Sequence, residues 1–336
     1  MFFWLYIIST FGLLIWGYLA GDANWFLALI NSFRYFLFLP LILFWIEKLW
    51  VGIEKFPLFL LTLLTGLFIY FYIWFPFYEV FDKSKVIVFK GEPLKVMTFN
   101  VLVVNPSTES IINTIRQARP QIIALQEITP TRASSLKNSL KDLFPFNSSS
   151  AGKSTIDTMV LSNYPIVKVQ EIPLEAGNSQ LVFIQTPTKL IPLINIHTES
   201  IDPLDIFGDQ DNIFMAYKRR EKSFNDIIDY LKRSGINLSE VMIVGDFNST
   251  EGNQTYKIMQ SAGLIDSYRE VNPILPNAFT FPHNMKGLFK KLKDFWPLLR
   301  IDYIWAGSSY KCTNSEVVNQ KTGSDHKPLI STFGLK

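Results

Sequence analysis

Hydrophobic and polar positions divide the chain into an apolar N-terminal part and a longer part of mixed pattern. Residues 1–20 and 56–78 contain no charged side chain, and residues 23–46 form a third apolar run in which Arg34 is the only charge. A helix needs about 20 apolar residues to cross the roughly 30 Å hydrocarbon core of a bilayer. The pattern predicts three transmembrane helices, over about 1–20, 25–46 and 56–78; two spans are the alternative.

Two other interpretations of the apolar runs compete with this prediction. A signal peptide carries Lys or Arg before its apolar stretch and a small-residue cleavage site after it, and the first run shows neither. A core helix of a soluble protein is the alternative for the run at 56–78. Arg34 is tolerable inside a span if it faces a neighbouring helix or snorkels to the interface.

Charges beside the apolar runs give opposite indications of orientation. The loop at 47–55 carries Lys48 and Lys55, so the positive-inside rule places this loop in the cytoplasm and the large domain outside. Four lysines after the last run favour the opposite orientation, with the large domain in the cytoplasm: Lys83, Lys85, Lys90 and Lys95. We expect the domain on the outer side, the lipid bilayer as a partner, and no obligate protein partner.

The pattern changes after a linker at 79–93, and residues 94–336 predict one catalytic domain. Short apolar runs predict strands at 94–101, 121–126, 157–162, 191–197, 241–246, 301–306 and 328–333. Helical spacing of apolar residues predicts helices at 107–118 and about 213–234. This alternation indicates a layered α/β fold in which sheets pack between helices.

Composition argues against one mode of nucleic-acid binding and against cysteine chemistry, and it leaves open a nuclease that recruits its substrate through metal ions. The 32 Lys and Arg residues nearly balance the 29 Asp and Glu residues, which argues against binding of nucleic acid through a strong basic field. Cys312 is the only cysteine, so the chain has no intramolecular disulfide and no cysteine-rich metal site.

Polar residues stand at the ends of five predicted strands. Four of them close a strand and one begins a strand: Asn100, Glu127, His197, Asp246 and, at a strand start, Asp302. Enzymes of the α/β class collect site residues from distant segments at strand ends. A carboxylate at the mouth of a buried strand is costly unless it is paired or bound to metal.

Seven motifs around these positions carry a family resemblance. In order they are MTFNV around Asn100, IIALQEI around Glu127, LSNYPI at 161–166, INIH ending at His197, VGDFN at 244–248, RIDYIW at 300–305 and GSDHKPL at 323–329. Their order resembles the endonuclease/exonuclease/phosphatase superfamily over nearly all of 94–336. The resemblance implies a DNase I-like, four-layered α/β sandwich of two packed mixed sheets flanked by helices. The preceding apolar helices also resemble bacterial members held in the inner or plasma membrane.

The resemblance implies a divalent metal site. Glu127 is implied as the principal ligand with Asn100 beside it, and Asp325 as a residue that reaches the metal or orients the neighbouring group. Oxygen ligands select Mg²⁺ or Mn²⁺ over zinc. Taken alone, Glu127 is also compatible with a surface position after a strand, and Asn100 with a turn.

The same resemblance implies the catalytic residues. Asp246 orients or deprotonates the attacking water, and Asn248 donates a hydrogen bond to the phosphate; an Asx turn is the alternative for this pair. Asp302 is paired with His326, which supports developing charge on the phosphate.

His197 is implied to bind phosphate or to assist the leaving group. The family usually has an apolar residue after this histidine, whereas Thr198 and Glu199 follow here. Asp157 is the one candidate for its acidic partner. His283, in a proline-containing loop, is expected to be an ordinary surface residue.

The sequence leaves the substrate open. Lysines and aromatic residues alternate over 285–300, a pattern that suits an anionic membrane, nucleic acid or an amphipathic loop packed on the domain. Nucleic acid and a phospholipid head group are therefore both candidate phosphoester substrates. A phosphomonoesterase and a catalytically silent membrane binding module are the other hypotheses.

Overall fold

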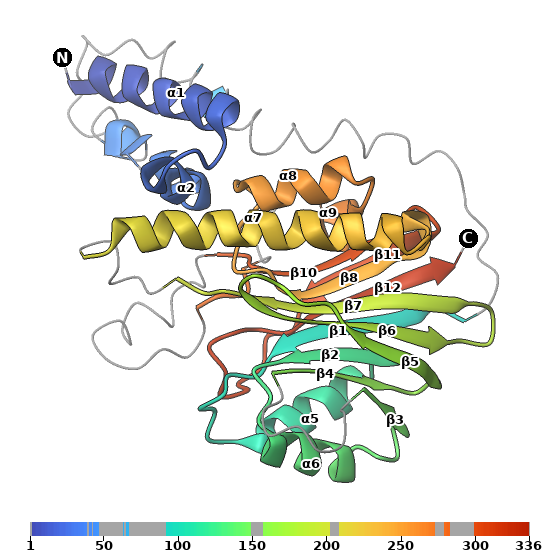
Figure 1. Cartoon of the computed structure of the whole chain (residues 1–336). Helices are drawn as coiled ribbons and strands as arrows, with labels where there is room; N and C mark the ends of the chain where they lie inside the picture. Colours follow the sequence, from blue (N-terminus) through green and yellow to red (C-terminus); the bar gives the residue numbers. More distant parts are fainter. Residues whose placement is uncertain are drawn as a thin grey trace.

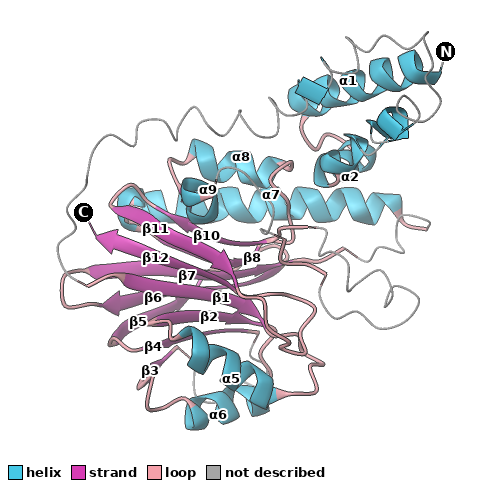
Figure 2. Ribbon diagram, turned by 180° about the vertical axis from the view of Figure 1, so that it is seen from behind, coloured by secondary structure: helices cyan, strands magenta, loops and turns pink. Residues whose placement is uncertain are grey.

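From Leu94 onward the chain forms a sandwich of two sheets between two layers of helices (Figures 1 and 2). The computed structural model describes residues 2–38, 40–41, 43–46, 63, 65–66, 92–148, 157–201, 208–272, 279–282 and 299–335. The prediction of two mixed sheets flanked by helices is confirmed.

The first sheet has six strands, and two helices cover its outer face (Figure 1). Its order is β11 (Tyr310–Val317), β12 (Leu329–Leu335), β1 (Leu94–Asn100), β2 (Ile122–Gln126), β4 (Thr158–Ser162) and β3 (Phe146–Asn147). Strand β1 runs parallel to β2 and antiparallel to β12. The covering helices are α5 (Thr108–Ala118), capped by the Ser107 side chain, and α6 (Pro130–Ser139), capped by Thr129.

The second sheet also has six strands, and its outer face lies against the longest helix of the domain. Its order is β5 (Ile166–Glu171), β6 (Gly177–Gln185), β7 (Leu190–Thr198), β8 (Met242–Asp246), β10 (Asp302–Ala306) and β9 (Ile265–Asp266). The helices that follow or cover these strands are α7 (Gln210–Arg233), the short η5 (Leu238–Glu240), α8 (Gln254–Ser261) and α9 (Ser267–Val271). Strand β8 runs parallel to β7 and antiparallel to β10.

Three apolar layers hold the sandwich together because the central strands are buried on both faces. Val96, Val244 and Ile304 meet between the sheets. A second layer lies between the first sheet and α5 and α6, and a third between the second sheet and α7 and α8. Polar bridges also cross the middle layer, and in one of them the Gln126 amide donates to the Asn195 carbonyl oxygen at 2.7 Å.

The predicted elements of this domain are all present, with ends within three residues of those expected. The strands β3, β5, β6, β9 and β11 and the helices α6, α8 and α9 were not predicted. Strand β5 lies at a sheet edge and most of its side chains are exposed, so its sequence lacks the continuous apolar run of the central strands. The segment 285–300 and His283 lie outside the described residues, apart from Leu299 and Arg300.

The N-terminal part begins with α1 (Phe2–Ala20) and α2 (Trp25–Ser32), followed by the 3₁₀ helix η1 (Arg34–Phe38). Among the described residues no single helix is long and apolar enough to cross a membrane; α1 and α2 reach the length together but meet at 109°. The helix predicted over 25–46 is not continuous in the structure, where α2 ends at Ser32 and η1 follows, and the transmembrane spans stay a prediction. The predicted span at 56–78 and the linker at 79–93 lie almost entirely outside the described residues.

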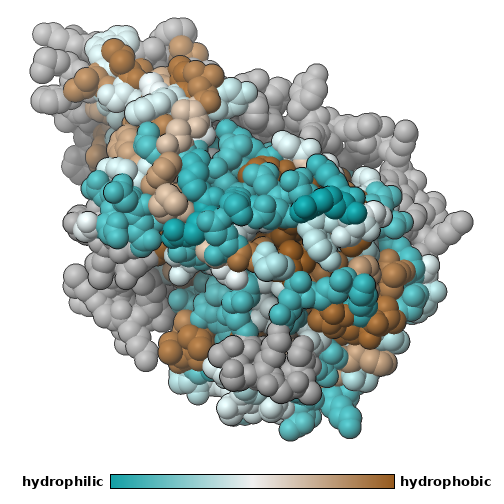
Figure 3. Space-filling model, viewed as in Figure 1, coloured by the Kyte–Doolittle hydropathy of each residue, from teal (hydrophilic) through white to brown (hydrophobic). Residues whose placement is uncertain are grey.

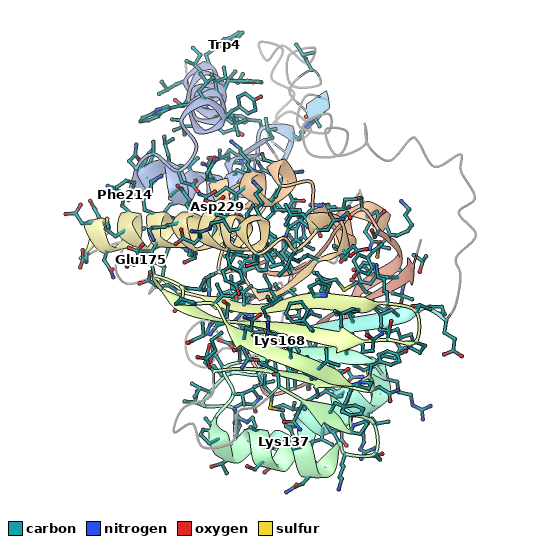
Figure 4. The ribbon with its side chains drawn as sticks, turned by 45° about the vertical axis from the view of Figure 1, so that its right-hand side comes forward. Trp4, Lys137, Lys168, Glu175, Phe214 and Asp229 are labelled. Atoms are coloured by element: carbon teal, nitrogen blue, oxygen red, sulfur yellow. The ribbon has the colours of Figure 1, made fainter. Side chains whose placement is uncertain are left out.

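The two N-terminal helices have different surroundings. Helix α1 exposes apolar side chains along its length, and Figure 3 shows hydrophobic residues gathered over this part of the molecule. Helix α2 instead buries Leu27 and Ala28, the latter against Ile213 and Tyr217 of α7. Figure 4 shows Phe214 on the part of α7 nearest the N-terminal helices, and Lys137 on α6 in the opposite outer layer.

A buried cluster of ionic groups supports the second sheet. Glu251 accepts hydrogen bonds from both Arg269, at 2.6 Å, and Arg300, which also pairs with Asp266. Burial alone would raise the pKa of Glu251, but the two guanidinium groups outweigh it and lower the pKa well below its usual range. The native state therefore requires an ionised Glu251.

We expect Glu251→Gln to lower the free energy of unfolding by about 3–5 kcal/mol, because two buried guanidinium groups lose the charge that compensates them. The wild type should also lose stability as pH falls below about 4.5, where Glu251 becomes protonated in the unfolded chain but resists protonation in the folded one. Urea unfolding followed by tryptophan fluorescence measures both effects.

The matched control is Arg116→Ala, which breaks the exposed pair between Arg116 and Asp142. Exposed ion pairs contribute roughly 0–1 kcal/mol. Equal losses of stability in Glu251→Gln and Arg116→Ala would contradict a structural role for the buried cluster.

Candidate active site

Strand register brings the predicted site residues together at one end of the sandwich. In the second sheet His197 of β7 and Asp302 of β10 are both register partners of Asp246 at the end of β8. In the first sheet Asn100 ends β1 beside Gln126, the residue before Glu127. The loops after these strand ends gather at the same end of the sandwich (Figure 2). Residues from five distant segments thus converge on one site.

Asn100 links the carboxylates of the two sheets. Its amide nitrogen donates to Glu127 Oε1 at 2.8 Å and to Asp246 Oδ2 at 3.0 Å, while its Oδ1 accepts from the backbone N–H of Leu102. This orientation presents N–H groups to the carboxylates, whereas a metal ligand would present oxygen. The ligand role of Asn100 stays a prediction and requires the amide to rotate.

Glu127 is held by its backbone and by one neighbouring loop. Its φ is +57°, in the left-handed region that residues with a side chain seldom adopt, and it follows directly after β2. Its Oε2 accepts from the backbone N–H of Val103 at 2.8 Å. The turn and this bond direct the carboxylate toward Asn100 and the second sheet.

His197 has an acidic partner. Its Nδ1 lies 2.9 Å from Asp157 Oδ2, and the Asn178 amide donates to the same oxygen at 3.1 Å. The opposite ring nitrogen, Nε2, lies 3.9 Å from both Glu127 Oε1 and Asp246 Oδ2. The structure therefore places Asp157 beside His197, as the sequence analysis suggested.

His326 has the same arrangement on the other side of Asp246. Its Nδ1 lies 2.9 Å from Asp302 Oδ2, and its Nε2 lies 3.7 Å from Asp246 Oδ2. The ring of Phe281 packs at 4.9 Å from the imidazole. Two histidines, each oriented by its own carboxylate, thus direct their Nε2 atoms toward one buried aspartate.

These neighbours set the protonation states of the site. Burial alone would lower the pKa of both imidazoles, but the surrounding carboxylates outweigh it and raise the pKa of His197 to about 9 and that of His326 to about 10. Burial raises the pKa of Asp246, and the two histidines partly oppose this increase. At neutral pH both histidines are therefore cations beside Asp246.

The loop after β8 begins as an Asx turn. Asn248 has a φ of +45°, and its backbone N–H donates to Asp246 Oδ1 at 2.9 Å. Its side chain donates to the backbone oxygen of Thr198, whose hydroxyl in turn donates to Phe247 O at 2.7 Å. Thr198, which departs from the family pattern, therefore joins the end of β7 to this loop.

The residues present fit a divalent cation bound by oxygen. Asp325 Oδ1 is buried and has no hydrogen-bond partner among the described residues, and burial raises the pKa of this carboxyl. A buried oxygen of this kind is costly unless a cation or water compensates it. Together with Glu127 it supplies the hard oxygen donors that Mg²⁺ and Mn²⁺ prefer.

A second group of possible ligands is Asp246, Asp302 and His326, whose ligand atoms lie within 4.8 Å of one another. In the structure these residues form an ion pair, with His326 Nδ1 bonded to Asp302 Oδ2. A metal-binding imidazole must be neutral, whereas the carboxylates on both sides raise the pKa of His326 to about 10.

Sequence reasoning missed supporting residues. Ser324 donates to Asn100 O at 2.8 Å and accepts from the backbone N–H of His326, so it joins the last motif to β1. Its place in the motif GSDHKPL was a usable signal. Asn178 lies opposite His197 across the β6–β7 pair, and no signal in the sequence marks that pairing.

Comparison with known proteins identifies the family. The sequence profile of the endonuclease/exonuclease/phosphatase family matches residues 97–326, so the chain belongs to that family. Members of this superfamily are phosphoester hydrolases. No curated protein matches the sequence.

Solved structures share the fold at low sequence identity. A family protein from Bacteroides thetaiotaomicron is 16% identical with a TM-score of 0.56, and the alignment covers 74% of this chain and all of that one. Sphingomyelinase C from Streptomyces griseocarneus is 17% identical with a TM-score of 0.52, covering 72% and 99%. Truncated TDP2 from Caenorhabditis elegans is 17% identical with a TM-score of 0.55, covering 73% and 99%.

We expect ¹⁵N NMR titration of the metal-free protein to show His197 and His326 titrating near pH 9 and 10, well above the usual value of about 6.5. Asp302→Asn should lower the pKa of His326 because it removes the carboxylate bonded to Nδ1. The third histidine, His283, supplies a reference signal, since the chain has only three. A pKa near 6.5 for His326 in the wild type would contradict the ion pair.

Proposed function

We propose that this protein is a divalent-metal-dependent phosphoester hydrolase that acts on phosphodiesters by in-line attack of water. The observation that carries this proposal is the pair of carboxylate-oriented histidines on the two sides of Asp246. Two cationic N–H donors suit the oxygens of a phosphoryl group. The buried carboxylate between them suits the proton of an attacking water.

Each residue of the site has a chemical task in this proposal. Asp246 accepts the proton of the water, and its raised pKa makes it a stronger base than an exposed aspartate. Asn248 donates to a phosphoryl oxygen. His326 stabilises developing negative charge, and Asp302 holds its proton on the ring. His197, oriented by Asp157, donates toward the leaving oxygen.

Mg²⁺ or Mn²⁺ would be held by Glu127 and Asp325, with Asn100 beside them. When bound, the ion supplies positive charge for the phosphoryl oxygens. The support for these ligands is the uncompensated Asp325 oxygen and the position of Glu127 within reach of the same amide as Asp246.

We expect the full chain in detergent to hydrolyse bis-p-nitrophenyl phosphate with Mg²⁺ or Mn²⁺ and to lose this activity with EDTA. Asp246→Asn and His326→Gln should each lower kcat by roughly 10²–10⁴-fold, the usual contribution of a proton-transfer or charge-stabilising residue. Release of p-nitrophenolate measures the rate.

The control is Lys137→Ala on α6, in the outer layer on the other side of the sandwich from α7 (Figure 4). This variant should keep full activity. A folded wild type that turns over no phosphodiester or phosphomonoester would favour the silent binding module. Activity that survives EDTA would contradict the proposed requirement for a divalent metal ion.

One observation favours a lipid phosphodiester as substrate over nucleic acid. Val103 and Val104 are 50% and 76% exposed on the loop whose backbone binds Glu127. The carbonyl groups of Leu102, Val103 and Asn105 all accept from Arg132, which holds the loop in shape. Two exposed valines beside the site suit the apolar part of a lipid, and the exposed apolar face of α1 supports a membrane location, with the bilayer as partner.

We expect Val103→Ser/Val104→Ser to slow hydrolysis of sphingomyelin in vesicles about tenfold, since burial of a valine side chain contributes on the order of 1.5 kcal/mol. Hydrolysis of bis-p-nitrophenyl phosphate should not change. Val167→Ser, at a residue 58% exposed on β5, is the matched control. Cleavage of plasmid DNA but not of sphingomyelin would favour a nuclease.

A further inference from the structure

The segment between α1 and the end of α2 is bonded to the catalytic domain. Asp22 is 2% exposed, and its Oδ2 accepts from the backbone N–H of Gln254 at 2.8 Å, at the first turn of α8. Its Oδ1 accepts from Asn31 at 2.8 Å, which closes the segment on itself. A carboxylate at a helix N-terminus is also favoured by the helix dipole. The contact is thus a specific polar one.

Asn253 joins this segment to the loop that leaves the active site. On one side its Nδ2 donates to Ala28 O at 3.1 Å, and its Oδ1 accepts from Ser32 Oγ at 3.0 Å. On the other side the same Oδ1 accepts from the backbone N–H and the hydroxyl of Thr250. Asn253 is fully buried, so each of these bonds is protected from water.

Two further contacts press the segment against the domain. The hydroxyl groups of Ser32 and of Tyr217 in α7 lie 2.6 Å apart, both buried. Gly252 packs so closely that a β-carbon there would overlap the backbone oxygen of Asn31. The backbone of α2 therefore rests directly on residues 250–253.

The inner side of the same loop is held by Asn248, which donates to Thr198 O, and by Glu251, which pairs with Arg269 and Arg300, but less well at Ser249 between them. Ser249 Oγ and Thr255 Oγ1 are buried without a hydrogen-bond partner among the described residues. Both line, together with Trp305, a narrow gap between the loop, α8 and β10 that has no room for a water molecule. The loop starts at Phe247, directly before Asn248, so its conformation sets the position of the proposed phosphate donor.

We propose that residues 21–33 are a positioning element of the active site: by binding Asn253 and Gln254 from outside, they fix the loop 247–253 that presents Asn248. This inference rests on the proposed function only for the role of Asn248. Asp22 and Ser32 act through the loop and touch no substrate. The apolar N-terminal part is then a component of the catalytic unit in addition to any role at a membrane.

The test uses the full chain in detergent with the variant Asp22→Ala/Ser32→Ala. We expect amide hydrogen exchange in 247–253 to become at least about tenfold faster, because the loop loses its outer bonds, while β1 and β7 stay protected. The matched control is Ser134→Ala, which removes a hydroxyl bonded to Pro130 O in α6. It should change neither the exchange of the loop nor the protection of the two strands. Unchanged exchange in the loop would overturn the proposal.

A kinetic cycle tests the link to Asn248. The double variant should raise KM for bis-p-nitrophenyl phosphate about tenfold in the wild-type background, the size expected for a misplaced hydrogen bond, and less than twofold in Asn248→Ala. Equal effects in both backgrounds would overturn the positioning of Asn248. If the wild type is inactive, the proposed function fails, and the exchange measurement alone decides whether the segment orders the loop.

Discussion

The buried carboxylate of Asp246 is the constraint on which the rest of the site depends. It is 1% exposed at the end of a central strand, where an uncompensated charge would be strongly destabilising. Two imidazolium groups and the Asn100 amide supply the compensation, and each imidazole requires its own acid, Asp157 or Asp302. Stability and chemistry therefore impose the same arrangement: the cations that make the charge tolerable are those that suit a phosphoryl group.

That arrangement exists because two sheets end at the same level. Strands β7, β8 and β10 place their polar ends in register, and packing of the sheets brings β1 and β2 to the same edge. The packing is apolar apart from bridges such as Gln126 to Asn195, which fix the lateral position of one sheet on the other. A one-residue slip in the register of any of these strands would move its polar end residue to the opposite face of the sheet.

The N-terminal part shows how packing changes the meaning of a pattern. Residues 23–46 are apolar enough to predict a membrane span, yet α2 ends at Ser32 and buries Leu27 and Ala28 against the catalytic domain. The distinguishing signals are its few polar residues. Asn24 caps the start of α2, and Asn31 and Ser32 bond across to Asp22 and Asn253. A hydropathy average does not register such residues.

The sequence alone determined the central strands, the α/β class and the candidate site residues at the strand ends, because continuous apolar runs and the polar residues that close them are local features. Asn178 and Ser324 support the site through contacts between distant segments, so only the tertiary structure showed their roles. The orientation of the Asn100 amide and the docking of α2 were likewise decided by packing, whereas the sequence had already offered Asp157 as the candidate partner of His197. Hydrogen-bond geometry and desolvation depend on neighbours that sequence spacing does not specify.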